Sequence, residues 1–64
     1  MNNYDENKVR VITDVVMESL EIKECYRIAC NLSEDELSQL KTVFNINIIE
    51  EFDTTALYLF KKRS

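Results

Sequence analysis

The 64-residue chain is predicted to be all-α, either a small helical hairpin or a three-helix bundle. Three observations favour helices. Apolar residues repeat at three- or four-residue spacing over two stretches, a helix-start signal lies between these stretches, and there is no glycine or proline to break a helix. We expect residues 1–64 to form a single domain, because a chain of this length is too short for two cores.

The first predicted helix covers residues 6–30. Two apolar stripes run along it: Val9, Ile12, Val16 and Leu20 in one, and Val11, Val15, Ile22, Cys25 and Ala29 in the other. Together they are wider than one neighbour can cover, so we expect a bend near residue 21 or packing on two sides. The β-branched residues between Val9 and Val16 also suit a strand, but strict alternation fails at Ile12.

A junction at residues 31–36 predicts the start of the second helix. Asn31 is expected to close the first helix in a left-handed conformation. Ser33 and Glu36 have the spacing of a capping box, and Leu32 and Leu37 that of a hydrophobic staple. Glu34, Asp35 and Glu36 add three carboxylates to the first turn, where the helix dipole favours negative charge.

The second helix is expected over residues 34–52, with a stripe of Leu37, Leu40, Phe44, Ile48 and Phe52, and a short third helix over 54–62. An alternative remains open for the C-terminal part. Residues 44–48 alternate between apolar side chains and asparagine, which is typical of a strand. With a turn at 53–55, residues 43–62 would then form a β-hairpin and the fold would be α+β.

Charge and residue types exclude several functions. The net charge is −4, and residues 1–60 carry five bases against twelve acids, with Lys61, Lys62 and Arg63 near the end. An acidic body repels nucleic acid, so direct nucleic-acid binding is not expected. The chain has no histidine, and we therefore expect no enzyme, no metal and no cofactor.

Cys25 and Cys30 are expected to be reduced, small buried residues in a cytoplasmic protein. The polar N-terminus does not resemble a signal peptide. No apolar run approaches the ~20 residues that span a bilayer, so no membrane association is expected.

These observations favour a protein-protein interaction module: a small acidic regulator or inhibitor that forms a homodimer and occludes a basic surface of its partner, such as a nucleic-acid-binding protein. The alternative is a dimeric, DNA-associated transcriptional regulator. Aromatic and acidic residues are the expected contact positions, since aromatic side chains carry much interface energy. They are Tyr26, Glu34, Asp35, Glu36, Phe44, Phe52, Tyr58 and Phe60.

Overall fold

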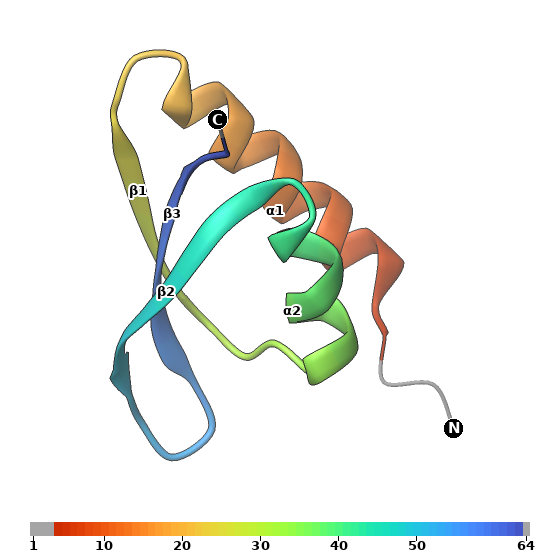
Figure 1. Ribbon diagram of the computed structural model, residues 1–64. Helices are drawn as coiled ribbons and strands as arrows, with labels where there is room; N and C mark the ends of the chain where they lie inside the picture. The colour runs from red at the N-terminus through yellow and green to blue at the C-terminus, as the bar shows by residue number, and fades with distance from the viewer. Residues whose placement is uncertain (1–3, 64) are drawn as a thin grey trace.

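The computed structural model describes residues 4–63 and has an α+β fold, so the all-α prediction is wrong (Figure 1). The order is α1 (Glu6–Leu20), β1 (Cys25–Cys30), α2 (Glu34–Lys41), β2 (Phe44–Glu51) and β3 (Ala56–Lys62). The strands form one antiparallel sheet in the order β1-β3-β2. Both helices lie on one face of it, which we call the helix face, and the other is the open face.

The first helix ends ten residues earlier than the predicted 6–30. Its core stripe is confirmed, because Val9, Ile12, Val16 and Leu20 are all buried. The helical repeat has no apolar successor after Leu20, since the next positions on that face are Lys23 and Glu24. From residue 25 the chain is a strand, whose alternate residues Tyr26, Ile28 and Cys30 are half-buried and pack against the core.

The C-terminal part adopts the alternative, a β-hairpin, and not the helices expected over 34–52 and 54–62. The second helix stops at Lys41, with Thr42 as its C-cap. The apolar-polar alternation from Phe44 to Ile48 then forms β2, because it puts the isoleucines on one face and the asparagines on the other. The spacing of Leu37, Leu40, Phe44, Ile48 and Phe52 suits a helix only by coincidence.

Strand β3 lies at the centre of the sheet and fixes its faces. Ala56, Tyr58 and Phe60 are buried beneath the helices, whereas Leu57 and Leu59 are half-buried on the open face. β1 pairs with one side of β3 and β2 with the other. A register shift between Ile48 and Glu50 marks a bulge in β2, which is common at sheet edges.

The core is one cluster between the helices and the sheet. Phe60 is fully buried and meets Phe44 edge to face, with ring centroids 5.7 Å apart and an interplanar angle of 82°. Such aromatic pairs stabilise a core beyond the area they bury. In the part of the chain that the structure describes, neither helix is long and apolar enough to cross a membrane.

Removing the Phe60 ring should therefore destabilise the fold severely. We expect Phe60→Ala to lower the free energy of unfolding by about 3–5 kcal/mol, because it leaves a cavity in the core. Phe52→Ala is the matched control, since that ring is 51% exposed, and should change stability by less than about 0.5 kcal/mol. Urea titration followed by circular dichroism measures both. Equal losses in the two variants would contradict this placement of the rings.

Candidate functional site

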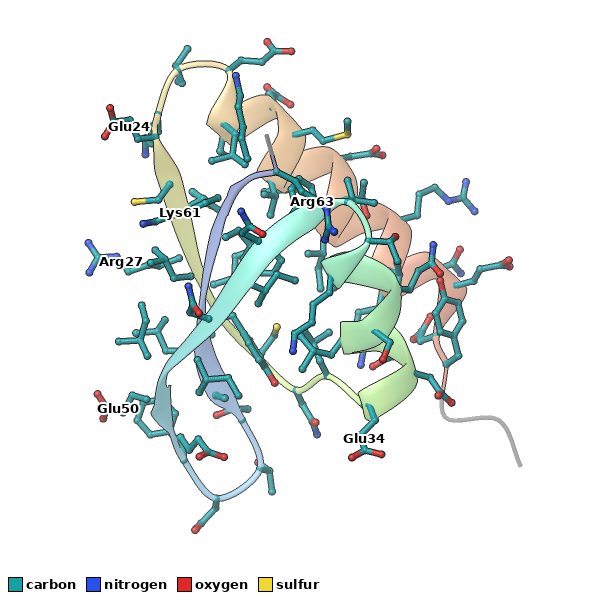
Figure 2. All side chains as sticks on the ribbon, in the orientation of Figure 1. Glu24, Arg27, Glu34, Glu50, Lys61 and Arg63 are labelled. Carbon is teal, nitrogen blue, oxygen red and sulfur yellow. The ribbon has the colours of Figure 1, made fainter. Side chains whose placement is uncertain are left out.

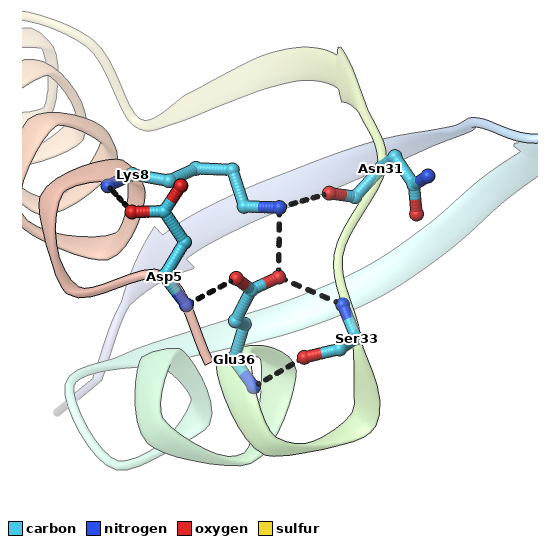
Figure 3. Close-up of polar contacts among 5 residues, drawn as sticks. All are labelled: Asp5, Lys8, Asn31, Ser33 and Glu36. Carbon is cyan, nitrogen blue, oxygen red and sulfur yellow. Dashed lines mark hydrogen bonds and ion pairs between the residues drawn. The ribbon is translucent and has the colours of Figure 1, made fainter. Parts of the chain in front are cut away.

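The most connected polar group is the carboxylate of Glu36, which is only 1% exposed (Figure 3). Its Oε2 accepts a hydrogen bond of 2.7 Å from the backbone N–H of Asp5. Its Oε1 accepts a hydrogen bond of 2.9 Å from the backbone N–H of Ser33 and forms an ion pair with Lys8 Nζ over 2.8 Å. Lys8 Nζ also donates to the carbonyl of Asn31 over 2.7 Å. The starts of α1 and α2 and the end of β1 are thus joined.

Part of this network was predicted from local spacing. The capping box is confirmed, because Ser33 Oγ accepts from the Glu36 N–H over 3.2 Å and the Glu36 side chain bonds back to Ser33. Asn31 does not close a helix: it follows a strand, and no non-glycine residue among 4–63 has a positive φ. Its carbonyl instead accepts the hydrogen bond from Lys8 Nζ. Leu32 and Leu37 both pack against the core.

The Glu36 network has the properties of a structural ion pair. The ion pair with Lys8 and the backbone N–H donors hold the pKa of Glu36 at about 2, against an ordinary 4.5. Such a carboxylate stays ionised at neutral pH and is a poor general base. No buried side-chain nitrogen or oxygen in residues 4–63 lacks a hydrogen-bond partner. We therefore see no proton-transfer group in this network.

The two cysteines lie on opposite faces of β1. Cys25 pairs with Lys61 on the open face, whereas Cys30 pairs with Ala56 on the helix face. Both are free, and five residues along a strand separate them by roughly 16 Å, far beyond disulfide reach. Burial raises the pKa of the Cys30 thiol, which disfavours the nucleophilic thiolate. Within the described range no group of three or more possible metal ligands gathers.

A shallow hollow of about 290 Å³ lies where α1 ends and β2 begins. Its lining is Met17, Leu20, Glu21, Val43, Phe44, Lys62 and Arg63. Arg63 is engaged elsewhere, because its Nη1 donates to the carbonyl of Lys41 over 2.6 Å. The hollow is half-open and at the lower limit of ligand-pocket volumes, so it does not define a small-molecule site.

The structure separates the predicted contact residues into three groups. Phe44, Tyr58, Phe60 and Glu36 are buried in the core, where a partner does not reach them. Tyr26 is half-buried on the helix face, with Lys23 Nζ 5.7 Å from its ring centroid. Phe52, Glu34 and Asp35 are exposed, and Figure 2 shows Glu34 at the start of α2, pointing into solvent.

The first apolar surface runs along α1, and we call it the α1 stripe: Val11, Asp14, Val15, Glu18 and Ile22. The four positions within α1 are three or four residues from one another, so their side chains are neighbours on one side of the helix. Val11 is 60% exposed, Val15 40% and Ile22, just past the helix end, 83%. Val11, Val15 and Ile22 belong to the second of the two predicted stripes, whose other members Cys25 and Ala29 lie in β1. Among residues 4–63 no second neighbour covers the α1 stripe.

The second apolar surface is the β2 edge, which we define as residues 44–52. Ile48, Ile49 and Phe52 are each roughly half exposed, and the carboxylates of Glu50 and Glu51 lie between them. Of these apolar residues only Phe52 was among the predicted contacts. The edge position of β2 could not be read from the sequence, because it depends on β3 lying between β1 and β2.

Comparisons of the chain with protein-family models, curated proteins and solved structures gave no match. The α1 stripe and the β2 edge are therefore the surfaces from which we infer what the chain binds.

Neutralising Glu36 tests the role assigned to the network. Glu36→Gln removes the charge that Lys8 and the backbone donors need, and we expect a loss of about 3 kcal/mol in the free energy of unfolding at pH 7. Glu34→Gln, at an exposed position of the same turn, is the control and should lose less than about 1 kcal/mol.

The pH dependence gives a second, independent readout. The pKa of Glu36 is lowered in the folded state, so its contribution is fully present above about pH 4.5 and is lost as pH falls through about 2. The stability gap between the wild type and Glu36→Gln should therefore narrow over that range. A gap that stays constant in acid would contradict the assignment.

Proposed function

We propose that this chain is a non-enzymatic module that binds another protein through the α1 stripe and blocks a basic surface of that partner by occupying it. One observation carries the proposal: Val11 and Val15 are exposed on one side of α1, with Ile22 exposed just past its end, whereas the opposite side of α1 already forms the core. Exposed apolar stripes of this kind are typical of helix-in-groove recognition.

The charges of the stripe support a basic partner. Asp14 and Glu18 alternate with the valines and are exposed. Two cations lie near the start of the stripe: Lys8 is paired with Glu36, and Arg10, one turn before Asp14, donates a hydrogen bond to Asn7 Oδ1. A partner groove with an apolar floor and a rim of lysine or arginine would complement this arrangement in both polarity and charge.

A reducing, cytoplasmic setting agrees with this proposal. Cys25 and Cys30 are free and lie on opposite faces of the same strand, so the chain does not depend on a disulfide for stability. The alternative function, direct DNA binding as a regulator, gains no support from α2, whose exposed first residues Glu34 and Asp35 would repel phosphates.

A binding comparison tests the proposed surface. The wild type and the variant Val11→Ser/Val15→Ser/Ile22→Ser are immobilised, and proteins retained from a host extract are quantified at low and high salt. We expect a basic protein that the wild type retains, that salt weakens, and that the variant binds at least about tenfold more weakly. The purified partner is then titrated against both chains.

The control variant is Thr54→Ser, at an exposed position of the β2–β3 turn, which should bind as the wild type does. Equal retention by the wild type and the triple variant would overturn the proposal. Binding to duplex DNA with a steep salt dependence, in place of any protein, would favour the alternative function.

A further inference from the structure

The β2 edge is a second surface, independent of the α1 stripe. One side of β2 pairs with β3, and its other side has no partner strand among the described residues. Every residue from Asn47 to Glu51 is exposed. An edge strand of this kind presents unpaired backbone N–H and C=O groups to any strand that can match it.

We infer that two copies of this chain pair through their β2 strands, antiparallel about a two-fold axis at Asn47, to form a continuous six-stranded sheet. The β2 edge of one copy is then covered by the β2 edge of the second copy. This pairing does not depend on the proposed function, which uses the α1 stripe.

The register follows from the faces that β3 imposes. Ile46 and Ile48 pair with Phe60 and Tyr58 and so lie on the helix face. Asn45 and Asn47 pair with Lys61 and Leu59 on the open face. After the bulge at residue 49, Glu50 pairs with Leu57 on the open face and Glu51 with Ala56 on the helix face.

A two-fold axis at Asn47 then matches every pair by face, because residue 49 is skipped in both copies. The opposed residues are Asn47 with Asn47, Ile46 with Ile48, Asn45 with Glu50, and Phe44 with Glu51 of the second copy. Side chains opposed in this way lie about 5 Å apart and interact directly. The two Ile46–Ile48 pairs would cover apolar surface that is exposed in a single chain.

Charge complementarity favours the same arrangement. Lys61 and Glu50 lie toward opposite ends of the sheet (Figure 2), so an antiparallel second copy brings unlike charges together. Glu50 of the second copy would lie two strands, roughly 9–10 Å, from Lys61, with the short side chain of Asn45 between them. Glu51 of the second copy would likewise lie two strands from Lys62 on the helix face, with Phe44 between them.

Sedimentation equilibrium on the full chain, reduced and at micromolar concentrations, tests the dimer. A species of twice 7.6 kDa supports it, and a mass of 7.6 kDa at every concentration overturns it. Asn47→Lys places two like charges opposite each other at the axis and should weaken dimerisation on the order of fivefold. Thr54→Lys adds the same charge at the hairpin turn and should not.

A charge exchange tests the register. Glu50→Lys and Lys61→Glu each create like charges across the interface and should weaken the dimer, whereas the double variant Glu50→Lys/Lys61→Glu should restore it. Within one chain Glu50 pairs with Leu57, four positions before Lys61 along β3, so restoration reports on contacts between copies. Equal dimerisation of the wild type and all three variants would overturn the β2 pairing. A circular dichroism spectrum like that of the wild type shows for each variant that the chain is still folded.

Discussion

The buried carboxylate of Glu36 is the interaction on which the arrangement of the fold depends. It accepts hydrogen bonds from the starts of both helices and an ion pair from Lys8, which in turn binds the chain just after β1. Burying a charge in so small a core is costly unless it is fully paired. Here both oxygens are engaged, so the carboxylate that caps the start of α2 also fixes the start of α1 against it.

The two helices together cover one face of the sheet, and the core lies between them and that face. Strand β3 places Phe60, Tyr58 and Ala56 under the helices, and α1 contributes a single buried stripe to the same core. Among residues 4–63 no further helix or strand covers what is left. Two apolar surfaces, the α1 stripe and the β2 edge, therefore remain exposed, and our proposals assign a different partner to each.

The sequence predicted the local features of the fold and missed those set by long-range pairing. The capping box and the core stripe of α1 depend on residues a few positions apart, and both are present. The alternation from Phe44 to Ile48 was visible, but it competed with a helical spacing of leucine and phenylalanine that tertiary packing overrode. The alternation of Tyr26, Ile28 and Cys30 was a usable signal for β1 that the helical interpretation hid.

For the candidate surfaces, too, the sequence predicted what depends on local spacing and missed what depends on the tertiary fold. Val11, Val15 and Ile22 could be grouped from helix geometry alone, yet their exposure became known only with the position of α1. Phe44, Tyr58 and Phe60 were expected at an interface because aromatic side chains often anchor one, and instead they build the core. Lys8 and Glu36 are separated in the sequence by most of α1 and all of β1, so no local pattern predicted their ion pair.

The most direct test of this account is an NMR titration of the Glu36 side-chain carboxyl carbon in the folded protein. We predict a midpoint near pH 2, because the ion pair with Lys8 and the backbone donors favour the ionised form. A midpoint near the ordinary value of 4.5 would show a solvated carboxylate and would contradict the central role assigned to Glu36.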